Sequence, residues 1–175
     1  MPISRLLSSS CRTCCRVLCV FVLTALAAPL HLAQAAEPKA APASVNRLLA
    51  EEAVSSLSSG IRYRFGSTNP DRGLDCSAFV GYLFKEAVGE DLPRTAKEIS
   101  DMGKHVGLND MEPGDLVFFG KGKRHVSHVG IYVGGKKFIH ASRKHGAVYE
   151  SGLNEPYWQK HFSGARRLTT TLPRS

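Results

Sequence analysis

The chain has 175 residues, with 23 lysines and arginines against 15 acidic residues, and a formal net charge of +8 at pH 7. No basic stretch is interleaved with aromatic residues, which argues against nucleic-acid binding. The positive excess suits either an acidic extracellular polymer or an ordinary solvated surface.

Residues 1–35 are typical of a secretory signal peptide. Three arginines come before an apolar run at 17–28, and Ala33-Gln34-Ala35 places small residues at the cleavage positions. The run is shorter than the roughly 20 residues of a membrane-spanning helix, so we expect no stable membrane anchor after cleavage; a retained anchor is the alternative. Cleavage would leave 140 residues with a net charge of +5, exported to the periplasm or the cell exterior.

Cleavage would also change the cysteine content. Four of the five cysteines lie within the first nineteen residues, so the mature chain would keep only Cys76. A disulfide framework is then absent, and a domain of this size can fold on its apolar core alone. A lone thiol in an oxidising compartment is a liability unless it does chemistry, so Cys76 is the first candidate functional residue.

The rest of the chain divides into a linker, a domain and a tail. Residues 36–43 are a Pro/Ala linker, residues 44–170 form the domain, and residues 171–175 are the tail. Apolar spacing and capping residues predict three helices in the first half of the domain. They cover residues 44–58, 75–89 and 95–103.

The second half of the domain is rich in short strand patterns. Alternating apolar residues and glycine turns predict these strands. Because helices come first and strands follow, we expect an α+β domain with an antiparallel sheet. The strands are predicted at 116–119, 128–133, 137–141, 147–151 and 165–169.

Cys76 and two histidines form the candidate chemistry. Cys76 stands at the predicted start of a helix, where free backbone amides and the helix dipole favour a thiolate; a small buried cysteine is the structural alternative. His128 opens one strand and His140 lies on the next, so both are candidates for a base and its orienting partner. A zinc site is the rival use of these three residues, but no Cys-x-x-Cys or His-x-x-x-His pair in the domain supports it. We therefore expect no metal and no cofactor.

Strand parity tests the histidine pair. With a strict two-residue loop at Gly134-Gly135, His140 would face Val129 and the two histidines would point to opposite faces. A loop of odd length, or a bulge, places His140 opposite Gly130 and diagonal to His128 on the same face. A catalytic pair therefore predicts an odd-length loop or a bulge.

Five segments of the domain, in chain order, form a recognisable set. They are Asp75-Cys76-Ser77, Leu92-Pro93-Arg94-Thr95-Ala96, Pro113-Gly114-Asp115-Leu116-Val117-Phe118-Phe119, Ser127-His128-Val129-Gly130-Ile131-Tyr132 and Phe138-Ile139-His140-Ala141. Together they resemble the NlpC family of papain-like cell-wall cysteine peptidases. The similarity runs from about residue 47 to residue 168, and residues 153–158 and 164–167 look like the branch of murein DD-endopeptidases.

The resemblance implies a papain-like fold, with N-terminal helices packed on a central antiparallel sheet, and a peptidoglycan endopeptidase. Cys76 matches the nucleophile, His128 the general base and His140 the residue that orients it. The expected substrate is a peptidoglycan stem peptide, and the protein is expected to be a monomer. The residues that match substrate-contacting positions are Tyr63, Asp75 and Ser77.

The bond to be cut is the finer expectation. The resemblance of residues 153–158 and 164–167 favours the amide between D-alanine and diaminopimelate, and the γ-D-glutamyl to diaminopimelate bond is the alternative. An inactive wall-binding module, an amidase and an acyltransferase are other possibilities, and an adaptor or a regulatory protease is a conceivable partner. Departures from the family pattern affect the pocket wall and a loop, and they concern Ser67, Ala78, Ile99 and residues 69–72.

Overall fold

The computed structural model describes residues 44–121 and 125–169. The expected signal peptide (1–35), linker (36–43) and tail (171–175) lie outside the described residues. Within the described residues, no helix has the length and apolar character needed to cross a membrane.

All three predicted helices are present. Ser44 caps the first by accepting a hydrogen bond from the amide of Arg47 (3.3 Å), and Gly89 ends the second in the left-handed conformation. Thr95 and Glu98 form a capping box for the third helix, which ends at Ser100, earlier than predicted. The helices are α1 (Val45–Ser55), followed by the 3-10 turn η1 (Ser56–Ser58), then α2 (Cys76–Val88), α3 (Ala96–Ser100) and α4 (Pro156–His161). Helix α4 was not expected from the sequence.

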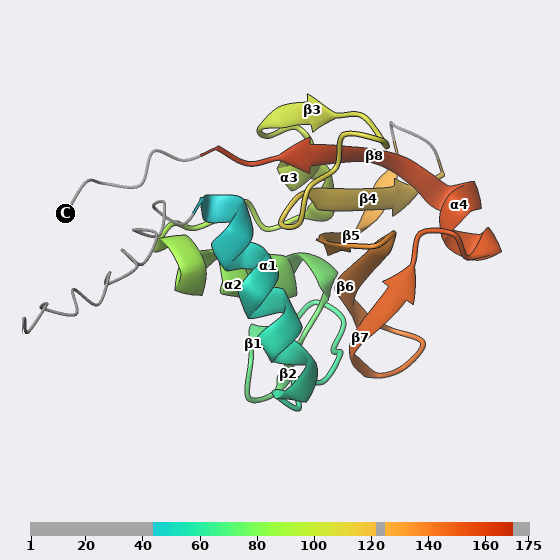
Figure 1. Ribbon diagram of the computed structural model, residues 1–175. Helices are drawn as coiled ribbons and strands as arrows, with labels where there is room; N and C mark the ends of the chain where they lie inside the picture. Colours follow the sequence, from blue (N-terminus) through green and yellow to red (C-terminus); the bar gives the residue numbers. More distant parts are fainter. Residues whose placement is uncertain (1–43, 122–124, 170–175) are drawn as a thin grey trace, which may run out of the picture. The chain divides into compact units, whose positions relative to one another are not determined.

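A six-stranded antiparallel sheet forms the second half of the domain (Figure 1). Its order is β3-β8-β4-β5-β6-β7, and the expected α+β class is confirmed. The strands are β3 (Lys104–Val106), β4 (Leu116–Gly120), β5 (Val126–Gly134), β6 (Lys137–Ser142), β7 (Ala147–Gly152) and β8 (Phe162–Arg167). Two-residue strands β1 (Thr68–Asn69) and β2 (Gly73–Leu74) form a separate small hairpin.

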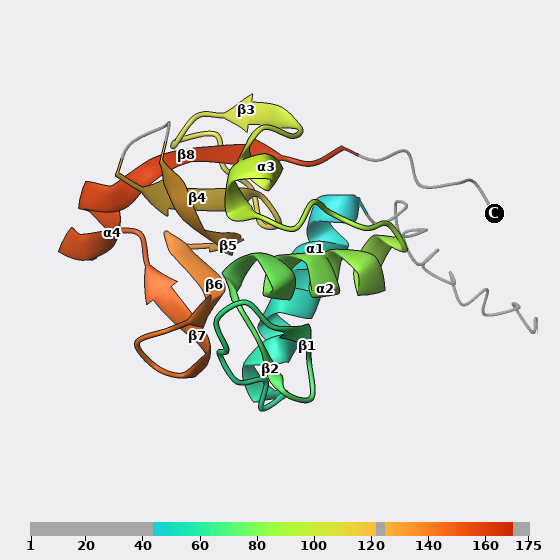
Figure 2. The same ribbon diagram turned by 180° about the vertical axis from the view of Figure 1, so that it is seen from behind.

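The two faces of the sheet bury different sets of apolar side chains. Helices α1, α2 and α3 contact β5 (Figure 2). They share the larger core with Phe118 and Ile131. Helix α4 contacts β4, and its Trp158 packs with Phe119 and Phe138 in the smaller core. Alternate residues of β4 and β6 therefore enter different cores, as the two-residue period of a strand requires.

The β5–β6 register contains the irregularity that the histidine pair requires. Ile131 pairs with Ile139 and Tyr132 with Phe138, but the register shifts by one residue before Gly134 pairs with Lys137. This bulge places His140 beside Gly130, where an added Cβ would lie 3.2 Å from Cβ of His140 and 2.7 Å from the ring of Phe138. The predicted bulge is confirmed, and glycine at 130 leaves room for the histidine.

A buried carboxylate joins the first helix to the sheet. Asp115 is fully buried and accepts hydrogen bonds from Nε of Arg167 (2.8 Å) and Nδ2 of Asn46 (2.8 Å). A second bond from Arg167 (2.9 Å) and one from the amide of Glu112 (2.8 Å) occupy its other oxygen. Every lone pair that faces the interior is thus paired, as a buried charge requires.

Candidate active site

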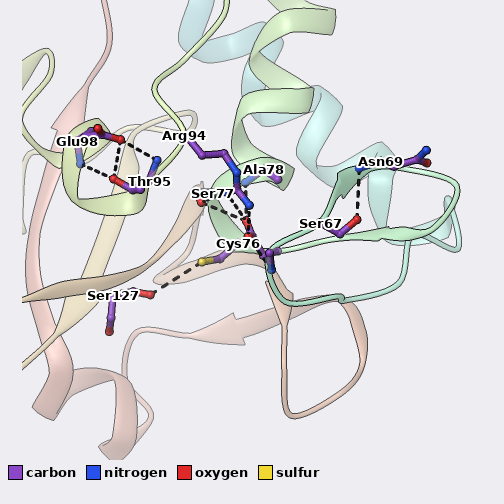
Figure 3. Close-up of polar contacts among 11 residues, drawn as sticks. Ser67, Asn69, Cys76, Ser77, Ala78, Arg94, Thr95, Glu98 and Ser127 are labelled. Atoms are coloured by element: carbon purple, nitrogen blue, oxygen red, sulfur yellow. Dashed lines mark hydrogen bonds and ion pairs between the residues drawn. The ribbon is translucent and has the colours of Figure 1, made fainter.

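Cys76 is the first residue of α2. The preceding residue, Asp75, caps this helix by accepting a hydrogen bond from the amide of Ala78 (2.9 Å). Figure 3 shows the sulfur of Cys76 directed at the carbonyl oxygen of Ser127, 4.0 Å away on β5. Since Ser127 immediately precedes His128, the helix start and the histidine strand meet at this point.

The environment of the thiol differs from the sequence expectation. Burial raises the pKa of Cys76, although the backbone amides of Val129, Ser77 and Cys76 itself act in the opposite direction. A raised pKa means that the resting sulfur is a thiol at neutral pH, and the expected thiolate is not favoured. The reason is desolvation, which outweighs the helix-terminal amides.

The two histidines form a hydrogen-bonded chain that ends on β7. Nε2 of His128 lies 2.9 Å from Nδ1 of His140, and the two rings are nearly perpendicular, at 89°. Nε2 of His140 lies 3.2 Å from Oγ of Ser151. His140 and Ser151 are almost wholly buried, so each ring nitrogen of His140 has one fixed partner.

An aromatic cage surrounds the histidine pair. The ring of Trp158 stacks on His128, with centroids 5.4 Å apart and an interplanar angle of 23°, and meets His140 edge-on at 5.1 Å. Phe119 and Phe138 pack against the same tryptophan at 4.6 Å and 5.1 Å. This cage shields both imidazoles from water, His140 almost completely and His128 in part.

Burial keeps both imidazoles uncharged. It lowers the pKa of His128 to about 4, and it lowers the pKa of His140 to about 3 with a further contribution from the charges of His128 and His145. A neutral His128 whose Nε2 is occupied by His140 has only Nδ1 left to accept a proton. The site therefore rests as a thiol beside a neutral base.

A separate network holds the residues next to the nucleophile. Arg94 donates from Nη1 to Asp75 (3.1 Å) and Ser77 (3.0 Å), and from Nη2 to the second oxygen of Asp75 (2.5 Å). Burial raises the pKa of Asp75, but the bonds from Arg94 and the amide of Ala78 outweigh it and lower the pKa overall. Asp75 thus remains a carboxylate that positions the helix start. Substrate contact by Asp75 and Ser77 stays a prediction.

Tyr63 contributes a hydroxyl to the same region. Burial raises its pKa, the neighbouring Cys76 and Asp75 add to the rise, and Arg143 opposes it. The phenol therefore stays protonated and keeps an O–H group to donate.

One cleft of about 1280 Å³ brings these groups together. It is open on one side and reaches from the β1–β2 region to α4, so an extended peptide could lie across it. No group of three or more histidine, cysteine or acidic residues in the described ranges is arranged to hold a metal ion. All six residues named from the sequence line this cleft: Tyr63, Asp75, Cys76, Ser77, His128 and His140.

Comparison with protein families matches residues 60–167 to the NlpC/P60 family. The chain belongs to this family. The family-level expectation drawn from the five segments is thereby confirmed, and so is the fold. An NLP/P60 protein of Staphylococcus aureus, similar to a lipoprotein, superposes with a TM-score of 0.62 at 31% identity over 73% of this chain and 42% of its own.

Two curated relatives of this NlpC/P60 protein have names that describe different hydrolase activities. Murein DD-endopeptidase MepS/Murein LD-carboxypeptidase of Escherichia coli is 45% identical over 109 residues, which are 62% of this chain and 56% of the relative. Gamma-DL-glutamyl hydrolase of Bacillus subtilis is 41% identical over 117 residues, which are 66% of this chain and 28% of the relative. The chain thus spans about half, or less, of the length of the relatives it matches.

Three residues of the site were not singled out from the sequence. Arg94 lies in a segment that supports the resemblance, but its pairing with Asp75 depends on the fold. Ser151 and Trp158 reach the histidines only through the β6–β7 register and through α4. The sequence offered one signal for Trp158, the aromatic pair Tyr157-Trp158 followed by His161. Aromatic residues with a polar tip are frequent where one end of the ring is buried and the other meets solvent or a ligand.

Proposed function

We propose that this protein is an exported cysteine endopeptidase that hydrolyses an amide in the stem peptides or crosslinks of peptidoglycan. The observation that carries the proposal is the hydrogen bond between His128 and His140 beside Cys76, within a member of the NlpC/P60 family. The likeness to MepS, whose name gives it as a murein endopeptidase, supports the substrate class.

The chemistry follows from the resting state of the site. As the sulfur of Cys76 attacks the amide carbonyl, its proton passes to Nδ1 of His128, and His140 accepts a hydrogen bond from Nε2 of the imidazolium that forms. Nδ1 then gives this proton to the leaving amine, which departs and leaves a thioester. A water molecule, deprotonated by His128, adds to the thioester, and the carboxylate product and free thiol are released.

The developing oxyanion needs donors that are already in place. The amide of Cys76 at the start of α2 is one, and the hydroxyl of Tyr63 is a second. Both groups lie at the cleft wall and need no charge change to donate. Asp75 and Ser77 would meet the stem peptide on the same side.

The bond that we propose is the amide between D-alanine and diaminopimelate, on the likeness to MepS. The γ-D-glutamyl to diaminopimelate bond is the second candidate, because the Bacillus subtilis relative is named as a γ-DL-glutamyl hydrolase. The same proposal includes export of the protein and its association with the cell wall. It also includes a monomeric state and recruitment of an adaptor or a regulatory protease. The mass of the protein isolated from cells tests removal of residues 1–35.

Mass spectrometry of fragments from a defined muropeptide dimer tests the function directly. The expected products are two monomers, one whose stem ends in D-alanine and one whose diaminopimelate has a free amino group. Fragments cut after γ-D-glutamate would instead support the second candidate bond. The Cys76→Ala protein is the control and should release no fragment. An intact dimer after incubation with the wild type would refute the endopeptidase and leave a wall-binding module.

A further inference from the structure

The cleft wall carries positive charge that the protein does not neutralise. Its acidic lining residues are Asp75 and Glu155. Asp75 forms an ion pair with Arg94, and an oxygen of Glu155 accepts a hydrogen bond from the amide of Gly152 (2.6 Å). The cations of the wall therefore meet little negative charge within the cleft itself.

Three of these cations have no acidic partner among the residues that the structure describes. Lys97 pairs with Asp101 outside the cleft. In contrast, Lys121, Arg143 and Lys144 form no ion pair with any residue in the described parts of the chain. They come from two different places, since Lys121 follows β4 and the other two occupy the β6–β7 turn.

Hydrogen bonds and a ring contact fix the conformation of the β6–β7 turn. Oγ of Ser142 lies 2.9 Å from Nδ1 of His145 and also accepts the amide of His145 at 3.3 Å. The ring of His145 stacks on Tyr149 with centroids 3.6 Å apart and an angle of 16°. The carbonyl of Gly146 accepts the amide of Tyr63 at 2.8 Å. The turn is thus fixed to the segment that carries a site tyrosine.

Arg143 lies close enough to the reaction centre to act on it electrostatically. The positive charge of Arg143 opposes the rise in the pKa of Tyr63, whereas the interaction with Cys76 adds to that rise. Lys121 is anchored by its amide, which donates to the carbonyl of His125 at 3.2 Å, three residues before His128. Positive side chains thus line the cleft from two different connections, the β6–β7 turn and the segment that follows β4.

We propose that Arg143, Lys144 and Lys121 bind free carboxylates of the stem peptide beside the cut amide, so that the enzyme selects ionised stems over amidated stems. The inference rests on the proposed function and is argued for the amide between D-alanine and diaminopimelate. A diaminopimelate residue crosslinked through one amino group carries a carboxylate on the same carbon, next to the scissile amide. Cations on the wall can pair with that carboxylate, whereas a carboxamide offers them no charge.

Two muropeptide dimers that differ only in this carboxylate or carboxamide test the selection. The wild type should cleave the ionised dimer with a kcat/KM on the order of tenfold higher than the amidated dimer, mainly through a lower KM. The effect is modest because solvent-exposed ion pairs contribute little each. The double variant Arg143→Gln/Lys144→Gln should bring the ratio of kcat/KM for the ionised dimer to kcat/KM for the amidated dimer close to one. Lys121→Gln should lower this ratio less. Lys104→Gln is the matched control, since Lys104 is exposed on β3 and outside the cleft.

A binding measurement separates this inference from the proposed function. The full chain carrying Cys76→Ala binds without cutting, and its single tryptophan, Trp158, lines the cleft and reports occupancy by fluorescence. Tighter binding of the ionised dimer, weakened by added salt, is the expected result. Equal dissociation constants for the two dimers would overturn the inference even if the wild type cuts both. Failure to cut either dimer would count against the proposed function, while the binding ratio would still decide the selection.

Discussion

Nε2 of His128 lies 2.9 Å from Nδ1 of His140, which leaves Nδ1 of His128 as the nitrogen available to the thiol of Cys76. The bulge in β5 is the backbone feature that permits this contact, because without it the two side chains would lie on opposite faces of the sheet. A single-residue shift in one hairpin therefore decides whether the base has an orienting partner.

Replacement of either histidine should lower kcat, but to different extents. His128→Ala removes the base, so we expect kcat to fall on the order of 10⁴-fold, as when other nucleophile–base units are broken. His140→Ala leaves the base but frees its orientation, with an expected loss on the order of 10²-fold. Steady-state kinetics on a muropeptide dimer measure both, with the exposed strand residue His105→Ala as the control. A larger loss in His140→Ala would contradict the assigned roles.

Ser151 should act as a positioning residue through His140. Ser151→Ala would leave Nε2 of His140 buried without a partner, at a cost of about 1–3 kcal/mol. We expect kcat to fall on the order of tenfold with KM unchanged, and Ser151→Thr, which keeps the hydroxyl, to restore it. Nitrogen NMR of the imidazoles should show a mixture of His140 tautomers in the alanine variant only. A single, unaltered tautomer in Ser151→Ala would show that the hydroxyl has no orienting effect.

The sequence predicted those features that depend on local chemistry. Capping residues located α2 and so placed Cys76 at a helix start, and strand parity anticipated the bulge that aligns His128 with His140. The cap follows from neighbouring residues, whereas the bulge was expected only on the condition that the two histidines act as a pair.

The features that the sequence did not predict depend on tertiary packing. Helix α4 has six residues and no side-chain cap, so its pattern is too short to stand out. Ser151 becomes a partner of His140 only because β7 pairs with β6 in a particular register. The protonation state of Cys76 depends on how completely the thiol is desolvated, which helix position alone does not determine.

The stability of the protein should depend on pH through His128, which is half-buried, and His140, which is buried. Their pKa values of about 4 and about 3 lie below the usual 6.5, so the unfolded chain binds protons that the folded protein does not. The free energy of unfolding should therefore be highest above pH 6.5 and fall between pH 6.5 and 4, by roughly 1.4 kcal/mol per pH unit for each histidine. Urea unfolding across this range measures the slope, and His140→Asn should show about half of it. A free energy that is constant from pH 6.5 to 4.5 would contradict the burial of the pair.

Asp115 should contribute to stability rather than to catalysis. It is fully buried and binds Arg167 and Asn46, so Asp115→Ala leaves a guanidinium without its main partner. We expect the free energy of unfolding in urea to fall by about 3–5 kcal/mol. Glu51→Ala, which breaks an exposed pair with Arg47, is the control and should leave the free energy of unfolding nearly unchanged. Equal losses in the two variants would mean that burial of Asp115 has no energetic consequence.

Trp158 should set the pH at which the enzyme loses activity in acid. Its ring covers His128 and His140, and burial is the cause of their lowered pKa values. Trp158→Ala admits water, so the pKa of His128 should rise from about 4 towards 6.5. Protonated His128 cannot accept the thiol proton, and the acid limb of kcat/KM should move to higher pH by the same amount.

Trp158→Phe is the matched variant because it keeps an aromatic ring over the histidines. It should retain an acid limb near that of the wild type, even if kcat changes through small shifts in packing. The pH profiles of the three proteins, measured from pH 4 to 8 on one muropeptide dimer, make the comparison. An acid limb in Trp158→Ala that coincides with the wild type would show that other side chains, such as Phe119 and Phe138, suffice to exclude water from the imidazoles.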